Sequence, residues 1–359
     1  MESAATDDTA RPTLAAVAAL AGVSASTASL AFSGAGPVSE KTKARVLAAA
    51  ATLDYAGPDP RAQSLRRGRS GIVGVVMEDR LSDAFRDPMN IAMLDGLADE
   101  LGPHGASLLL ITGNAEGTIS TAPVDGVVLV GCSTRLAESV NVFRQRGIPL
   151  VAIEAEPMDG VLAVDLDNRE GTRVIAEHLR DLGHLDVAIV SLPLDPEYNS
   201  GPLSAEREAA SEGYTASQRI LGARDVFPSA TGWVAAGSSI EEGFAAGTAL
   251  LAAPSRPTAV IAQSDLLAVG VIRAAIGLGL RVPEDVSVAG FDGVRLEGIA
   301  PHDLTTMVQP ALEKGRAAGR GVIALIEGGD ASPASFTSTF HLGTTTAVPR
   351  GTSRPVLVE

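Results

Sequence analysis

The chain has 359 residues, of which 45% are hydrophobic and 20% are charged. This length suits about two to three folding units, and the composition excludes a disordered or coiled-coil protein. The single cysteine, Cys132, excludes a disulfide framework and any metal site built from several cysteines. No apolar run approaches about 18 residues, and the acidic N-terminus does not resemble an export signal. We therefore expect a globular protein of the reducing cytoplasm, without a membrane segment.

The formal net charge of -15 is unevenly distributed along the chain. Residues 11–70 carry eight Lys or Arg and three Asp or Glu, a balance of +5. Residues 1–10 carry three acids, so the remainder of the chain carries -17. A small basic head thus precedes a large acidic body. Clustered cations of this kind suit the phosphates of a nucleic acid.

Residues 1–12 are predicted to be a flexible tail, and residues 13–56 an all-helical domain. Helical patterns cover residues 13–21, 24–32 and 39–53, and each opens with a Ser or Thr that can cap the first free N–H groups. Gly22 permits a tight turn between the first two patterns, and Val23 can fill the space beneath it. This spacing is typical of a helix-turn-helix. Its predicted core consists of Leu14, Val17, Leu20, Ala21, Val23, Ala28, Val46, Leu47, Ala50 and Leu53.

Residues 57–70 are predicted to be a linker that contains a short hinge helix. Pro58 and Pro60 interrupt any helix, whereas residues 61–67 are helix formers that end at Gly68. A segment this short is not stable alone in water. We expect it to fold only against a surface.

From residue 71 to residue 359, short β-branched runs alternate with amphipathic stretches. This alternation predicts an α/β body with parallel sheets and helices on both faces, and its size suggests two lobes. The strands are predicted at Ile72–Met77, Val127–Val130, Val187–Val190, Ala259–Ala262 and Val286–Ala289.

A series of motifs, in the same order along the chain, resembles the lactose-repressor family of bacterial transcription regulators. The similarity covers about residues 12–345. Its motifs are residues 13–31, 38–42, 45–49, 62–66, 164–171, 177–184, 257–265, 282–292 and 304–306. The resemblance implies a dimeric repressor with a helix-turn-helix head and a body like the periplasmic sugar-binding proteins. It also implies a first lobe of residues 71–166 and 294–327 and a second lobe of residues 167–293 and 328–348.

The resemblance implies that the second helix enters the major groove of DNA. Ser24 is interpreted as a cap more than as a DNA contact, and solvated positions are the alternative for Ser26 and Thr27. Leu30 stands where the family usually has an arginine and cannot form a bidentate bond to guanine. The candidate DNA-binding residues of the head are Thr13, Ser24, Ala25, Ser26, Thr27, Ser29 and Lys41.

In the hinge, the resemblance implies that Leu65 wedges between base pairs from the minor groove. The alternative is an ordinary apolar contact within a short helix. The other hinge candidates are Arg61, Ala62, Gln63 and Arg66.

Ligands of this fold bind between the lobes, near the carboxyl ends of strands. Glu154, Ser264 and Asp292 are the matching candidates, because carboxylates accept hydrogen bonds from sugar hydroxyls; a turn or cap role is the alternative. The family's arginine before Gly213 is absent, and Arg207, one turn earlier, is the candidate substitute. Residues 113–125 are shorter than usual, which predicts a trimmed first lobe.

We therefore predict a homodimeric transcriptional repressor whose affinity for a quasi-palindromic DNA operator changes when a sugar or related metabolite binds. The alternative is a small-molecule-binding protein whose head no longer binds DNA; the loss of arginine at Leu30 favours it and the lack of an export signal opposes it. Enzymatic motifs are missing, and the five histidines lack metal-ligand spacing. We expect no enzymatic activity and no cofactor or metal.

Overall fold

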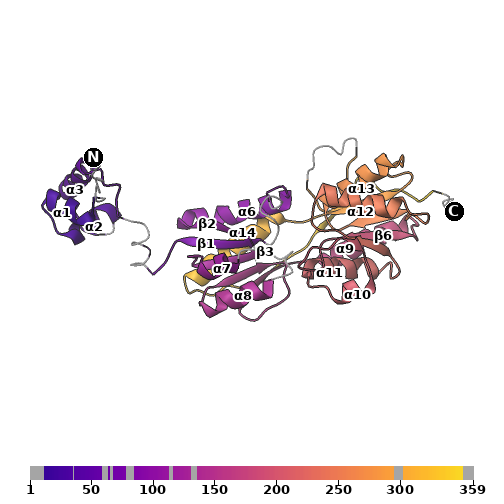
Figure 1. Cartoon of the computed structure of the whole chain (residues 1–359), viewed down its shortest axis with the longest axis horizontal. Helices are drawn as coiled ribbons and strands as arrows, with labels where there is room; N and C mark the ends of the chain where they lie inside the picture. The colour runs from indigo at the N-terminus through magenta and orange to yellow at the C-terminus, as the bar shows by residue number, and fades with distance from the viewer. Residues whose placement is uncertain are drawn as a thin grey trace, which may run out of the picture. The chain divides into compact units, whose positions relative to one another are not determined.

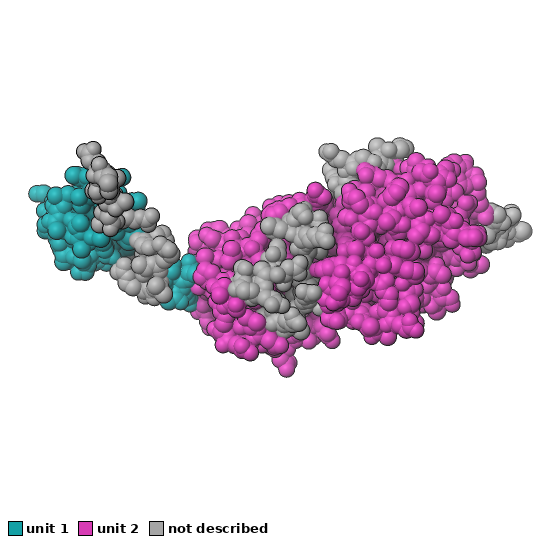
Figure 2. Space-filling model, viewed as in Figure 1, with its two compact units in different colours: residues 1–70 teal, residues 71–359 magenta. Residues whose placement is uncertain are grey.

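The chain forms two compact units, residues 1–70 and residues 71–359 (Figure 2). The structure is a computed structural model, which describes residues 12–34, 36–58, 64, 68–77, 85–112, 116–130, 136–294 and 302–350. The predicted tail up to Arg11 lies outside the described residues. So do the hinge candidates Arg61, Ala62, Gln63, Leu65 and Arg66.

Three helices make up the described part of the head: α1 (Leu14–Ala21), α2 (Ala25–Ser33) and α3 (Glu40–Thr52). These bounds confirm the three predicted helices to within a residue or two. The side chains of Thr13, Ser24 and Ser39 each accept a hydrogen bond from the backbone N–H three residues later. The three caps therefore form as the sequence indicates.

Small residues dominate the core of the head. Val17, Ala28 and Val46 are buried as predicted, but Leu20 is 54% exposed and Leu47 is 44% exposed, so the prediction was wrong for both. Alanines let the three short helices approach closely, and the buried stripe on each helix is narrow. Both leucines lie to one side of it. The buried set is Val17, Ala18, Ala21, Ala28, Ala31, Val46, Ala49 and Ala50.

The turn between α1 and α2 depends on a left-handed residue. Gly22 has φ 62°, a conformation that favours glycine, and its N–H bonds back to the end of α1. The N–H of Val23 donates to the carbonyl of Ala18 over 3.0 Å. As a result the chain bends by 102° between the two helices. Among the described residues no single helix is long and apolar enough to cross a membrane; this bent pair meets the criteria only when taken together.

The body contains two sheets (Figure 1). The first has six parallel strands in the order β12-β5-β4-β3-β1-β2. Helices α6 (Pro88–Leu101) and α14 (Ala311–Ile326) pack on one face, and α7 (Glu116–Thr121) and α8 (Leu136–Gln145) on the other. The shortened segment thus keeps a six-residue helix, α7. The strands are β1 (Ile72–Met77), β2 (Ser107–Thr112), β3 (Gly126–Val130), β4 (Leu150–Ile153), β5 (Val161–Leu166) and β12 (Ala334–Phe336).

The second sheet has the order β13-β11-β10-β9-β6-β8-β7, with its two outermost pairings antiparallel. Helices α9 (Asn168–Asp181) and α11 (Tyr214–Arg224) pack together, while α12 (Ile240–Leu251) and α13 (Asp265–Gly277) cover the opposite face (Figure 1). A short α10 (Ala205–Ala209) precedes α11. The strands are β6 (Val187–Ser191), β7 (Gly201–Pro202), β8 (Thr231–Val234), β9 (Ala259–Ala262), β10 (Ser287–Asp292), β11 (Thr305–Val308) and β13 (Thr339–His341).

The chain passes between the sheets three times: from β5 to α9, from β11 to α14, and from β12 to β13. The predicted lobe boundaries need two corrections. Residues 305–308 form β11 of the second sheet, because Thr306 pairs with Gly290. Residues 334–336 form β12 of the first sheet, because Ser335 pairs with Asp165. Strands of three or four residues are too short for periodicity to assign them to a sheet.

Candidate DNA-binding and effector sites

One face of α2 is open to solvent. Ala25, Ser26 and Leu30 are exposed on it, and Thr27 and Ser29 are half-buried. The Ser24 hydroxyl accepts the Thr27 N–H over 3.1 Å and lies 2.8 Å from the Thr27 hydroxyl and 3.0 Å from that of Ser26. The predicted cap at Ser24 is therefore confirmed. Thr13 likewise caps α1, with a 3.2 Å bond from the Ala16 N–H.

The basic residues of α3 are accessible to solvent. Lys41 and Arg45 are exposed and Lys43 is half-buried. None of the three forms an ion pair with another residue in the described part of the chain. Free cations beside an exposed helix can neutralise the phosphates of a duplex.

In the body, two predicted effector residues lie where strands end. Glu154 directly follows β4 of the first lobe, and Asp292 is the last residue of β10 in the second. Both side chains are buried, and both backbones are in the left-handed region, with φ 53° and 128°. Non-glycine residues in this region are typical of functional sites, because the conformation costs energy that packing must offset.

Arg219 of α11 lies between these two carboxylates. It is only 3% exposed, and its guanidinium is 3.7 Å from Glu154 Oε2 and 3.5 Å from Asp292 Oδ1. It donates through Nε to the side-chain oxygen of Asn168 over 2.8 Å, and also to the carbonyl of Gln263. The guanidinium also stacks on Phe291, 3.8 Å from the ring centre. Arg219 thus links an acid of each lobe.

A second buried cation, Lys314 of α14, contacts Glu154 from within the first lobe. Its side chain is fully buried, and its Nζ donates to Glu154 and to Gln309. Gln309 in turn donates to Asp292 over 2.6 Å, and Asn168 donates to Glu154 over 2.7 Å. We call these six residues the interlobe network, because Asn168 and Gln309 lie at the first two crossings between the sheets. Its members are Glu154, Asn168, Arg219, Asp292, Gln309 and Lys314.

The carboxylates of this region differ in their charge environment. Burial opposes the charge on Glu154, but Lys314 and Arg219 outweigh it and lower the pKa of Glu154 below its ordinary value. Burial raises the pKa of Asp292 well above its ordinary value, against the attraction of Arg219. Burial also raises the pKa of Asp265 to about 7, although Thr306 and the Val294 N–H donate to it. Such shifts are common where polar groups serve a ligand.

Ser264 takes part in a second contact between the lobes. It caps α13 by accepting the Leu267 N–H over 3.2 Å, and the Ser238 hydroxyl donates to it over 2.9 Å. Ser238 also hydrogen-bonds to Asp87, which caps α6 of the first lobe by accepting the Met89 N–H over 2.9 Å. Ser264 therefore has the cap role that the sequence left open, and it is linked to the first lobe through Ser238.

Arg207 lies apart from these residues. It forms an ion pair with Asp195 at 3.2 Å and donates to the carbonyls of Asn199 and Pro202. The buried cation beside Glu154 and Asp292 is instead Arg219, which the sequence analysis did not single out. A signal exists: Arg219 shares a buried helical stripe with Thr215, Ala216, Ile220 and Ala223. An arginine within such a stripe needs a charged partner.

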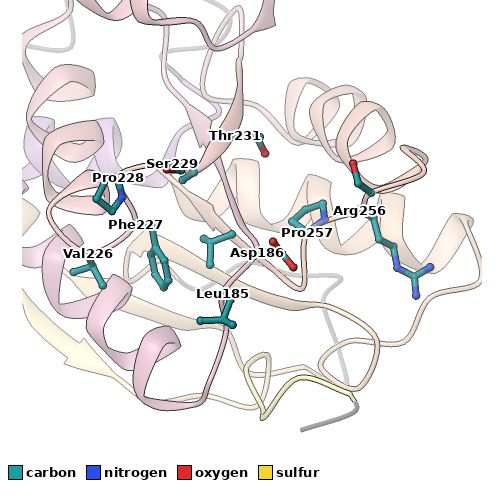
Figure 3. A pocket seen from close by; sticks show the side chains of 12 residues that line it. Leu185, Asp186, Val226, Phe227, Pro228, Ser229, Thr231, Arg256 and Pro257 are labelled. Atoms are coloured by element: carbon teal, nitrogen blue, oxygen red, sulfur yellow. The ribbon is translucent and has the colours of Figure 1, made fainter.

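One pocket of the body lies away from these residues. A cavity of about 490 Å³ is lined by Leu185, Asp186, Phe227 and Arg256 among others (Figure 3). It lies at the amino ends of β6, β8 and β9, at the edge of the sheet away from Asp292. None of the four predicted effector residues lines it. Among the described residues no group of three or more acids, histidines or cysteines could hold a metal ion.

A helix-turn-helix head, whose α3 cations pair with none of the described acids, is followed by a two-sheet body with a buried polar network between its lobes. This combination defines a DNA-binding regulator with a ligand-binding type of body. Comparisons with known proteins agree. Residues 13–57 match the family model for bacterial regulatory proteins of the lacI family, and residues 176–353 match a periplasmic binding protein-like domain.

Relatives of known name cover nearly the whole chain. The HTH-type transcriptional regulator IpsA of Corynebacterium glutamicum is 30% identical over 93% of this chain and 97% of its own. The ribose operon repressor of Escherichia coli K12 is 31% identical over 84% of this chain and 89% of its own. The chain belongs to the lacI family of bacterial regulatory proteins. It is a DNA-binding transcriptional regulator and not an enzyme.

Solved structures give the same fold. A lacI-family regulator from Corynebacterium glutamicum is 28% identical, with a TM-score of 0.71 over 93% of this chain and 98% of its own. The regulator CelR in complex with cellobiose is 26% identical, with a TM-score of 0.65 over 93% of this chain and the whole of its own.

Proposed function

We propose that two copies of this chain bind a quasi-palindromic operator as a repressor in the bacterial cytoplasm. The observation that carries the proposal is the exposed face of α2 beside cations that have no ion-pair partner among the described residues. Ala25, Ser26, Thr27 and Ser29 face the base edges, and Thr13, Ser24 and Lys41 contact the backbone. The hinge candidates Arg61, Ala62, Gln63, Leu65 and Arg66 belong to the minor-groove part of this proposal, with Leu65 as the wedge.

We also propose that a small molecule with several hydroxyl groups, such as a sugar, binds between the lobes. Glu154, Asp292 and Ser264 accept its hydrogen bonds, and Arg219 supplies a cation in place of the family's arginine before Gly213. Arg207 remains a candidate for the outer edge of the site. The proposal is supported by buried carboxylates from both lobes that converge on one arginine, and by the cellobiose named with the relative CelR.

Effector and operator are coupled through the lobes in this proposal. A ligand that bonds to Glu154 or Asp292 competes with Arg219 and Lys314 for these carboxylates. It therefore changes the contacts that hold the two lobes together. If this changes operator affinity by some factor, the operator changes effector affinity by the same factor.

Footprinting of the purified full-length protein on genomic DNA tests the first proposal. We expect protected sites with two-fold symmetry, whose affinity falls steeply as salt concentration rises. Sugars and nucleosides are then screened by thermal shift, and each hit is added to the footprinting reaction. Absence of salt-sensitive binding to any genomic fragment, with or without the small molecules, would instead favour a small-molecule-binding protein whose head does not bind DNA.

A further inference from the structure

The solvent-facing side of α2 has an unusual chemistry for a helix that reads DNA. None of its nine residues, Ala25–Ser33, carries a charge, an amide or an imidazole. The side chains that form bidentate bonds to guanine or adenine are therefore absent from the helix. Hydroxyl, methyl and apolar groups remain as the means of reading bases.

The hydroxyl groups at the start of α2 are largely engaged with one another. Ser24 bonds to the Thr27 N–H and lies within hydrogen-bond distance of the hydroxyls of both Ser26 and Thr27. Hydroxyls can also donate to or accept from several bases, so they discriminate weakly between them. The start of the helix thus provides limited base specificity.

Leu30 is the largest side chain on the exposed face. It follows Ser26 by four residues and Thr27 by three, on the same side of the helix, and is 36% exposed. Its terminal methyl groups lie against the loop that follows α2, since a Cβ at Gly36 would lie 3.0 Å from Leu30 Cδ2 and 3.3 Å from Leu30 Cδ1. The loop therefore holds the leucine in place while part of the side chain faces outward.

We propose that Leu30 is a specificity-determining residue that reads the C5-methyl group of a thymine in each half-site. This inference rests on the proposed binding of α2 in the major groove. Of the four bases, only thymine presents an apolar group there. Beside the polar edge of guanine, adenine or cytosine, leucine would displace water from groups that it cannot bond to. Thymine is thus the base that Leu30 favours.

The test removes only the methyl group. Duplexes are selected from a random library by the full-length protein at low salt, and each conserved thymine is then replaced by deoxyuridine. We expect one thymine per half-site at which this replacement weakens binding about fourfold, or about sixteenfold when both half-sites are changed. With Leu30→Ala, the same replacement should have no effect.

Matched variants separate the proposal from a loss of folding. Leu20→Ala and Leu47→Ala remove exposed leucines from α1 and α3 and should keep the deoxyuridine effect. Leu30→Met keeps an apolar side chain and should also keep the deoxyuridine effect. Far-ultraviolet circular dichroism checks that the head of each variant is folded. The deoxyuridine replacement could instead weaken binding at every thymine, and to the same extent for Leu30→Ala as for the wild type. That result would overturn the inference about Leu30 and leave the proposed operator binding intact. Failure of the wild-type protein to select any duplex would overturn the proposed operator binding and this inference with it.

Discussion

Arg219 and Glu154 belong to different lobes, yet the Arg219 guanidinium lies 3.7 Å from the Glu154 carboxylate and both side chains are buried. The pair lies beside the segments through which the chain passes between the two sheets, because Asn168 bonds to both. A buried ion pair at such a place makes lobe arrangement sensitive to anything that competes for either partner.

Removing the cation should leave Asp292 without its ion-pair partner and Glu154 with Lys314 as its remaining cation. We expect Arg219→Met to lower the free energy of unfolding by about 3–5 kcal/mol, the usual cost of breaking a buried pair. Chemical denaturation of the full chain at pH 7 measures it. Arg180→Met, which removes a half-exposed arginine on the surface of α9, is the control and should change stability far less. Equal stability of the two variants would show that Arg219 is not needed to balance Glu154 and Asp292.

Asp265 should make stability depend on pH. Burial raises its pKa from 3.8 to about 7, so between these values the folded chain binds a proton that the unfolded chain releases. Its contribution to stability is therefore full below about pH 4 and is lost as the pH rises through about 7. The slope of unfolding free energy against pH reports how many protons are released on unfolding. Asp265→Asn should reduce that number by up to one. Asp181→Asn, on the surface, is the control, and identical slopes for Asp265→Asn and wild type would contradict the prediction.

The contact between α6 and α14 should be intolerant of added volume. A Cβ at Gly315 would lie 2.1 Å from the carbonyl oxygen of Met93, so one helix backbone would have to move. We expect Gly315→Ala to cost about 1–3 kcal/mol of stability, measured by urea denaturation. Gly277→Ala, at a helical glycine with no atom nearby, should be neutral or stabilising. A neutral Gly315→Ala would mean that the two helices are more loosely packed.

Lys41 should contribute to DNA binding without regard to sequence. Replacing it with alanine should weaken binding to operator and to random duplex alike, and reduce the slope of log affinity against log salt by about one per protomer. Fluorescence anisotropy at several salt concentrations measures both. Arg180→Ala in the body is the control for a general change of charge. A loss confined to the operator would instead make Lys41 a base-reading residue.

Much of the local structure was predictable from the sequence. Ser24 and Ser39 cap helices as expected, and the strands at Ile72–Met77 and Ala259–Ala262 have the predicted bounds. Each of these features depends on neighbours within one turn or on an uninterrupted β-branched run. Short-range chemistry therefore decides them.

Long-range features were decided by the tertiary structure. Leu20 and Leu47 belong to apolar patterns but lie beside the buried stripe, and β11 and β12 join sheets that their sequence does not specify. Arg219 lies within a buried helical stripe, but that local pattern does not identify the acids that it contacts. Only the approach of α11 to β4 and β10 surrounds it with acids, because burial and charge pairing depend on segments far apart in the chain.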